Sequence, residues 1–183
     1  MRELSLNVLD VAQNSVTAGA TQLDIILTQS TAQQTLTIEI KDNGCGMTKE
    51  QLTSVRDPFF TTRTTRKVGL GVPLFKMAAE MTGGDFDIDS AVGVGTTVRA
   101  FFHTDHVDFV PISDMASTVV SLMAMNPQVN VRYRRAIDGK DFSVESETLA
   151  AILGDVPLNE PSIMRWLTEY INENTNELTE VQT

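Results

Sequence analysis

The sequence of 183 residues contains only one cysteine, Cys45, and two histidines, His103 and His106. A single cysteine excludes an internal disulfide. The histidines have no further metal-binding residues at ligand spacing, so we do not expect a structural zinc site. The sequence also lacks a long apolar run and a leader of charged and then apolar residues. Secretion and membrane insertion therefore have no support, and we expect a cytoplasmic protein.

Basic residues are scarce as well. Fourteen lysines and arginines are outnumbered by 24 aspartates and glutamates, which gives a net charge of −10. Such a chain would be repelled by duplex nucleic acid and by an anionic membrane surface, so we expect neither as a partner. With 42% hydrophobic residues, a chain of this length can bury one core. We therefore expect a globular protein with a main domain and a small appendage.

The first hundred residues alternate between helical and strand patterns. Leu4, Val8, Val11, Ala12 and Ser15 recur at helical spacing and predict a helix over 3–18. The patterns that follow predict antiparallel strands at 21–28 and 34–40, a short helix at 48–55, a helix at about 73–82 entered through Pro73, and strands at about 85–90 and 96–103. Residues 56–71 are rich in threonine, glycine and positive charge without a clean period, which predicts a mobile loop.

The last third of the chain predicts a second, smaller α+β unit. A helix from Ser113 or Asp114, a β-hairpin that turns at Asp138-Gly139, a short helix at LAAIL and a final helix from Pro161 follow in order. The apolar residues of the last helix, Met164, Trp166 and Tyr170 among them, are interpreted as core, and NTNELTEVQT as a frayed polar tail. We expect this unit, over 105–183, to pack on the first as one body, with a soft boundary near Asp105.

Asp10 and Asn14 form the first candidate for chemistry. They lie four residues apart in the first predicted helix, so their side chains share one face. A carboxylate and an amide placed in this way can converge on a hydrated divalent cation or on a water. The alternative is a pair of solvated polar residues, which is the usual outcome for an isolated motif.

The hexapeptide DNGCGM, residues 42–47, ends the second predicted strand. Asp42 can only accept hydrogen bonds while it is ionised, which suits the exocyclic amine of adenine. Gly44 and Gly46 would let the backbone come close to a planar ring. The alternative is a simple turn, which the sequence Asp-Asn-Gly also favours.

The segment KVGLGVPLFK places Gly69 and Gly71 just before a helix start, where free N–H groups and the helix dipole attract phosphate. Four basic residues crowd the same stretch: Arg56, Arg63, Arg66 and Lys67. A phosphate-binding lid is favoured over a solvated loop that balances nearby acids. Further on, GVGTTV adds a glycine-rich turn with two hydroxyls, which alone indicates only a hairpin.

Taken in order, DVAQNSVTAGAT, DNGCGM, DPFFTTR, GLGVPLFK and GVGTTV resemble the successive motifs of the Bergerat-type ATP-binding fold. This fold is shared by gyrase, heat-shock chaperone, histidine kinase and MutL ATPases, and the resemblance covers residues 4–103. The first motif resembles MutL, whereas the phenylalanine and second glycine motifs resemble histidine kinases. The implied fold is α+β, a two-layer α/β sandwich in which helices cover a mixed sheet. The implied domains are an ATP-binding domain at 1–104 and the small α+β extension at 105–183.

The resemblance also implies roles for single residues, with ATP and Mg²⁺ as the ligands. Asn14 would bind Mg²⁺, Asp42 would accept from the adenine amine, and Thr97 would help to fix adenine. The remaining positions carried over to nucleotide binding are Gly44, Gly46, Met47, Arg63, Lys67, Gly69, Leu70 and Gly71. Lys67 replaces the first glycine of the kinase-like Gly-x-Gly-x-Gly wording.

Asp10 falls where the ATPase branches and the anti-sigma serine kinases resemble one another in having a catalytic glutamate. Aspartate is one methylene shorter, and a base must lie within about 3 Å of the proton it takes. We therefore expect slow or partner-dependent turnover.

Three functions follow from the resemblance. The first is a regulatory protein that binds ATP and phosphorylates or sequesters a protein partner, as small anti-sigma kinases do. The second is an ATPase clamp in which nucleotide closes a homodimer, and the third is a nucleotide sensor without hydrolysis. We favour the first. No histidine precedes His103, so we do not expect an ordinary self-contained sensor kinase. Each function requires residues 56–70 to become ordered when nucleotide binds.

Overall fold

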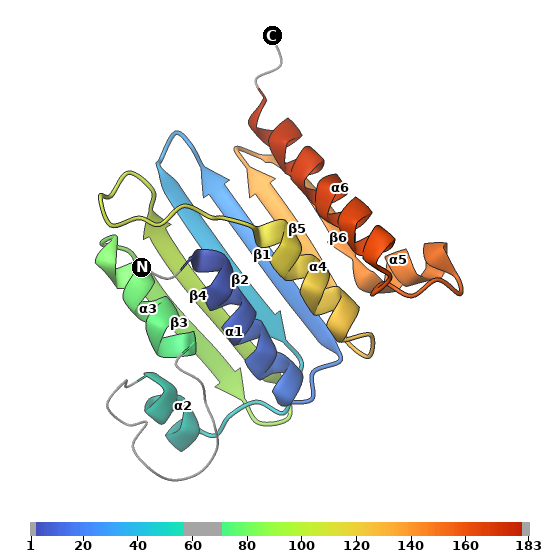
Figure 1. Ribbon diagram of the computed structural model, residues 1–183. Helices are drawn as coiled ribbons and strands as arrows, with labels where there is room; N and C mark the ends of the chain where they lie inside the picture. The colour runs from blue at the N-terminus through green and yellow to red at the C-terminus, as the bar shows by residue number, and fades with distance from the viewer. Residues whose placement is uncertain (1–2, 57–70, 181–183) are drawn as a thin grey trace.

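The computed structural model describes residues 3–56 and 71–180, and everything below refers to these. They form six helices and six strands (Figure 1). The helices are α1 (Leu4–Thr17), α2 (Lys49–Arg56), α3 (Gly71–Met81), α4 (Met115–Met125), α5 (Ser146–Leu153) and α6 (Pro161–Thr179). The strands are β1 (Gln22–Ser30), β2 (Thr35–Asp42), β3 (Asp85–Ala91), β4 (Gly95–His103), β5 (Asn130–Ile137) and β6 (Lys140–Glu145).

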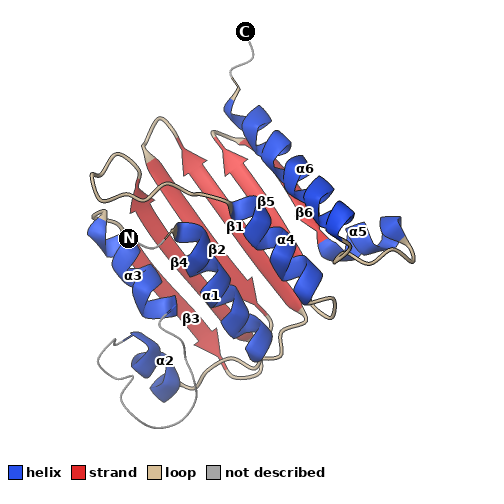
Figure 2. Cartoon of the chain, in the orientation of Figure 1, coloured by secondary structure: helices blue, strands red, loops and turns tan. Residues whose placement is uncertain are grey.

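All six strands belong to one mixed sheet with the order β3-β4-β2-β1-β5-β6. Neighbouring strands are antiparallel except for β1 and β5, which run parallel. The helices α1, α3, α4 and α6 cover one face of this sheet (Figure 2). The predicted α+β class and the two-layer arrangement are therefore confirmed.

Strand β2 shows why the sheet has one covered face. Leu36, Ile38 and Ile40 point toward the helices and are fully buried, whereas the alternate residues point to the other face. On that face Glu39 accepts a hydrogen bond from the guanidinium of Arg99 in β4 at 2.5 Å. Because side chains of a strand alternate with a period of two, the apolar residues line the core and the polar residues meet water.

The last third of the chain continues the sheet. Strand β5 pairs with β1 along eight residues, from Gln22↔Asn130 to Gln29↔Ile137. The predicted hairpin turn is confirmed, since Asp138 and Gly139 both have positive φ, at 49° and 83°, as a type I′ turn requires. The carboxylate of Asp138 also accepts hydrogen bonds from the backbone N–H and the hydroxyl of Thr31. The tip of this hairpin is thereby tied to the turn between β1 and β2.

Two predictions about the last helix were wrong. Residues 174–179 were expected to fray but belong to α6, where the hydroxyl of Thr175 donates to the carbonyl of Ile171 at 2.7 Å. Trp166 and Tyr170 were expected in the core but are 51% and 36% exposed. The helix lies at the edge of the sheet, so only the side that carries Leu167 and Ile171 is covered. Met164 is partly buried against the core, as expected.

Within the described part of the chain, no helix combines the length and apolarity needed to cross a bilayer.

Candidate functional site

Helix α1 brings the first candidate residues to the site. Its buried face contains Leu4, Val8, Val11, Ala12 and Ser15, as the sequence predicts. Asp10 and Asn14 lie outside this fully buried set and are of intermediate exposure. Their spacing of four residues places them on one side of the helix, so both can contact the same ligand.

The carboxylate of Asp42 lies at the end of β2 and is held by three donors. Oδ2 accepts from the hydroxyl of Ser15 at 2.5 Å. Oδ1 accepts from the backbone N–H of Gly44 at 2.8 Å and from that of Thr96 at 3.3 Å. Asp42 is only 8% exposed. An ionised carboxylate has about four acceptor positions, so one position on Oδ2 is left for a further donor.

The loop after Asp42 is fixed by neighbours from three parts of the chain. The side-chain oxygen of Asn43 accepts from the backbone N–H groups of Thr21 and Gln22, both at 2.9 Å. The N–H of Cys45 donates to the carbonyl of Ala18 at 2.9 Å, and its own carbonyl accepts from the N–H of Gly93 at 2.8 Å. The carboxylate is therefore presented by a rigid loop.

The glycines of this loop are required by the packing of the protein itself. A Cβ at Gly44 would lie 2.9 Å from the Cβ of Ala18, and one at Gly46 would lie 1.9 Å from the carbonyl oxygen of Ala91. Gly46 also has φ of +69°, which favours glycine. The expected approach of an adenine ring to these glycines stays a prediction. The packing of the protein alone already excludes a larger residue at either position.

The assignment of Thr97 to the site is corrected by the strand register. Thr96 lies directly opposite Asp42, whereas Thr97 lies opposite Lys41 and Asp89. Both of these residues are exposed, so Thr97 points to the open face of the sheet. The sequence contains two adjacent threonines after Gly95, and only the register shows which one shares a face with Asp42.

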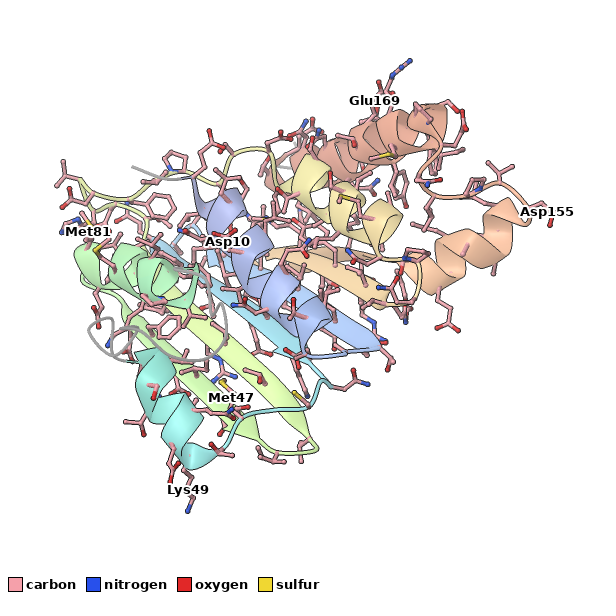
Figure 3. The ribbon with its side chains drawn as sticks, turned by 60° about the horizontal axis from the view of Figure 1, so that its bottom comes forward. Asp10, Met47, Lys49, Met81, Asp155 and Glu169 are labelled. Atoms are coloured by element: carbon pink, nitrogen blue, oxygen red, sulfur yellow. The ribbon has the colours of Figure 1, made fainter. Side chains whose placement is uncertain are left out.

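Ser90 is a site residue that the sequence did not indicate. Its hydroxyl lies 2.8 Å from the hydroxyl of Thr96 and 3.0 Å from the carbonyl of Gly95. It also accepts from the backbone N–H of Met47 at 2.9 Å, which places Met47 at the rim of the site beside β3 (Figure 3). No short motif contains Ser90, so only its pairing with Thr96 across β3 and β4 reveals it.

Gly71 brings the beginning of α3 against Asp10. A Cβ at Gly71 would lie 2.7 Å from the Cβ of Asp10, so the two helices touch at this point. Helix α3 begins two residues earlier than the sequence predicts, at Gly71 itself. The first backbone N–H groups of a helix have no partner within the helix. They and the positive end of the helix dipole therefore lie beside Asp10.

Four of the predicted nucleotide-binding residues, Arg63, Lys67, Gly69 and Leu70, lie outside the described residues, as does most of the predicted lid.

The donor set at α1 fits magnesium. Among residues 3–56 and 71–180, no three histidine, cysteine, aspartate or glutamate residues gather to hold a metal ion. Mg²⁺ that is bound together with substrate phosphates needs only one or two protein oxygens, because phosphate and water supply the rest. Asn14 and Asp10 offer such oxygens.

Comparison with known proteins agrees with this geometry. Residues 1–106 match the family described as "Histidine kinase-, DNA gyrase B-, and HSP90-like ATPase". A putative sensor protein of Shewanella frigidimarina is 34% identical over 103 residues, which are 55% of this chain and 16% of that protein. The sensor protein SrrB of Staphylococcus aureus is 34% identical over 102 residues, 53% of this chain and 17% of that protein. The chain thus matches about a sixth of the length of these relatives.

One solved structure resembles the fold beyond the family region. The N-terminal domain of a DNA repair protein matches with a TM-score of 0.54 and 17% identity, over 79% of this chain and 52% of that chain. At this identity the likeness concerns the fold alone. The family region ends at residue 106 and covers little more than half of the chain. The structural likeness therefore extends into the last third. From the ordered motifs, the anchored Asp42 and the match over residues 1–106, the chain belongs to the histidine kinase-, DNA gyrase B- and HSP90-like ATPase family.

Proposed function

We propose that this protein binds ATP with Mg²⁺ and uses it to phosphorylate or sequester a protein partner in the cytoplasm. The observation that carries the proposal is the carboxylate of Asp42, buried at the end of β2 with one acceptor position left. Family membership and the sensor proteins among the relatives support a role in signalling.

The adenine end of the site is formed by Asp42 and its neighbours. The remaining acceptor position on Oδ2 suits the exocyclic amine of adenine, which can only donate there. A guanine or inosine base would present a carbonyl oxygen at the same place and would leave two acceptors face to face. Thr96, opposite Asp42, replaces Thr97 in the proposed role of fixing the base.

The phosphate end is formed by α1 and the beginning of α3. Asn14 would hold Mg²⁺, which supplies charge neutralisation between the phosphates. The backbone N–H groups at the beginning of α3, from Gly71 on, would bind phosphate oxygens. We propose the same contact for Arg63, Lys67, Gly69 and Leu70 on the basis of the sequence motif.

Asp10 is the proposed catalytic base. In the transfer step, the hydroxyl oxygen of the partner bonds to the γ-phosphorus while the bond from this phosphorus to the bridging oxygen breaks. ADP leaves with the electron pair, and the carboxylate of Asp10 accepts the hydroxyl proton. With water in place of the partner, the same step is ATP hydrolysis.

Substitution of Asp42 by asparagine tests the base contact. Asparagine has nearly the same shape, so Oδ1 can keep its two backbone donors while the new amide NH₂ replaces Oδ2. A donor then faces the adenine amine. We expect ATP affinity to fall by a factor on the order of 10², because a charge-assisted hydrogen bond is lost and a donor is left unpaired. Isothermal titration calorimetry of ATP binding to the wild type and to Asp42→Asn measures this loss of affinity.

Inosine triphosphate provides the matched ligand control. It should bind poorly to the wild-type protein and should bind to Asp42→Asn more tightly than ATP does. Equal ATP affinity in the two folded proteins would contradict the proposed site.

The kind of function is tested with γ-labelled ATP and a cell extract of the source organism. Transfer of label to a second protein that disappears with Asp10→Asn supports the kinase function. Release of free phosphate alone, with closure of a homodimer, indicates the clamp. Nucleotide binding without either product indicates the sensor.

A further inference from the structure

The hydroxyl of Ser15 in α1 forms its hydrogen bond outside its own helix. Two residues later in the same helix, the hydroxyl of Thr17 donates to the carbonyl of Gln13, four residues back, at 2.9 Å. This is the common local bond of serine and threonine within helices. The hydroxyl of Ser15 instead donates to Oδ2 of Asp42 at the end of β2. The bond therefore joins α1 to the carboxylate that is proposed to bind adenine.

The bond between Ser15 and Asp42 is short and shielded from water. Its two oxygen atoms lie 2.5 Å apart, within the range of charge-assisted bonds from a hydroxyl to a carboxylate. Ser15 is 3% exposed and Asp42 is 8% exposed. A buried acceptor that loses its donor is costly to leave unpaired. We therefore expect this hydroxyl to matter more than a serine hydroxyl at the surface.

The two carboxylate oxygens of Asp42 are held unequally. Oδ1 accepts from the backbone N–H groups of Gly44 and Thr96, at 2.8 and 3.3 Å. Among the described residues, Oδ2 accepts only from the hydroxyl of Ser15. Each carboxylate oxygen has about two acceptor positions, so the hydroxyl occupies one position on Oδ2 and the other stays open. Ser15 therefore fixes the direction in which the open position points.

We propose that Ser15 is a positioning residue that gives Asp42 its selectivity for adenine over bases that present a carbonyl oxygen. This inference rests on the proposed binding of ATP at Asp42. With the hydroxyl in place, the open position of Oδ2 accepts from the exocyclic amine of adenine and repels the carbonyl oxygen of hypoxanthine. Without it, the carboxylate can rotate about its bond to Cβ, and both the attraction and the repulsion weaken. Selectivity is a difference between two affinities, so both must be measured.

Helix α1 also connects this contact to the phosphate end of the site. Ser15 directly follows Asn14, and successive side chains project from a helix about 100° apart. Asn14 would hold Mg²⁺ and the phosphates, whereas Ser15 faces Asp42. A ligand without a base can therefore show whether α1 still binds phosphate when the Ser15 hydroxyl is removed.

Titration of the 183-residue chain with nucleotides tests the role of Ser15. Ser15→Ala should bind ATP about tenfold more weakly than the wild type does, because a charge-assisted hydrogen bond no longer orients Oδ2. Its affinity for inosine triphosphate should stay equal or rise, so the selectivity for ATP should fall at least tenfold. Ser15→Thr keeps a hydroxyl at this position and should restore the selectivity.

Magnesium tripolyphosphate and Ser5→Ala are the controls. Tripolyphosphate has no base, so it should bind equally to the wild type and to Ser15→Ala. Ser5 is another buried serine of α1, 2% exposed, but it lies ten residues earlier, about 15 Å along the helix. Ser5→Ala should bind both nucleotides as the wild type does.

Two outcomes would overturn the role of Ser15 while ATP binding stands. The first is a Ser15→Ala protein with the selectivity of the wild type. The second is an equal loss of affinity for ATP and for tripolyphosphate, which would show that Ser15 only supports the fold of α1. A wild type without measurable affinity for ATP would contradict the proposed function itself, and the inference about Ser15 would fail with it.

Discussion

Gly71 at the beginning of α3 and Asp10 in the middle of α1 are packed so tightly that one methyl group has no room between them. A Cβ at Gly71 would lie 2.7 Å from the Cβ of Asp10 and 3.4 Å from its carbonyl carbon. The position of the candidate base is therefore coupled to the helix end that is proposed to bind phosphate. Any side chain added at position 71 must therefore displace Asp10.

The first prediction concerns Gly71→Ala. In an ordinary helix, glycine to alanine stabilises by about 1 kcal/mol. Here the added methyl group must push α3 away from α1, and overpacking of this kind costs roughly 1–3 kcal/mol. We expect lower stability in urea unfolding and a loss of ATP turnover.

Asp10→Ala provides the control for this prediction, because alanine keeps the Cβ that causes the clash. The double variant with both Asp10→Ala and Gly71→Ala should therefore be no more stable than Gly71→Ala alone. A Gly71→Ala protein that is as stable as the wild type would contradict the close contact.

The second prediction distinguishes two adjacent threonines. Thr96→Val removes the hydroxyl that lies 2.8 Å from the hydroxyl of Ser90, which costs about 1 kcal/mol, and we expect roughly tenfold weaker ATP binding. Thr97→Val changes a side chain on the open face and should leave ATP affinity unchanged. Valine matches threonine in shape and in strand propensity. Calorimetric titration of both variants decides the assignment, and a larger loss for Thr97→Val would reverse it.

The third prediction concerns the length of the side chain at position 10. Asp10→Glu should raise the rate of ATP turnover about tenfold, because the added methylene brings the carboxylate closer to the attacking oxygen. Asp10→Asn should abolish turnover. The ATP dissociation constant should change little in either variant, so single-turnover rates at saturating ATP are the measurement. A slower Asp10→Glu protein would show that aspartate is the adapted length.

The fourth prediction concerns stability at high pH. Burial raises the pKa of Tyr133 from 10.0 to about 12, and the positive charge of Arg135 opposes this rise only in part. Below pH 10 the phenol of Tyr133 is neutral in both the folded and the unfolded protein, so its ionisation does not reduce the free energy of unfolding. Between pH 10 and 12 the unfolded chain ionises first, so stability falls with pH, by about 3 kcal/mol in total.

Tyr133→Phe removes this contribution. Urea unfolding at pH 8, 10 and 11 should show a smaller decline for the variant than for the wild type. Parallel declines would show that other groups control stability in this range.

Most helices and strands of the fold could be predicted because each depends on a pattern of residues that are close in sequence. The alternation of Leu36, Ile38 and Ile40 and the turn at Asp138-Gly139 each depend on residues close in sequence. The parallel pairing of β5 with β1 depends on residues more than a hundred positions apart and has no local signal. The end of α6 was missed because its residues are polar. Its helix continues through hydrogen bonds such as that of Thr175 to Ile171.

The candidate site could be predicted in its main chemistry but not in its geometry. Asp42 stands out because a carboxylate follows an apolar strand. The choice of Thr96 depends on the register of β2 and β4, and the identification of Ser90 depends on the register of β3 and β4. Neither register can be read from the sequence. The need for glycine at position 46 also depends on a distant part of the chain, because a side chain there would clash with the carbonyl of Ala91.

The pairing of β5 with β1 has a consequence for any attempt to isolate the family region. A chain cut after residue 106 would keep every motif of the family. It would also expose the backbone of β1 from Gln22 to Gln29 as a long unpaired edge, together with apolar surface from α1 that α4 now covers. Exposed edges of this kind pair with other chains and aggregate. The region that this protein shares with its family is therefore shorter than the unit that folds as one sheet.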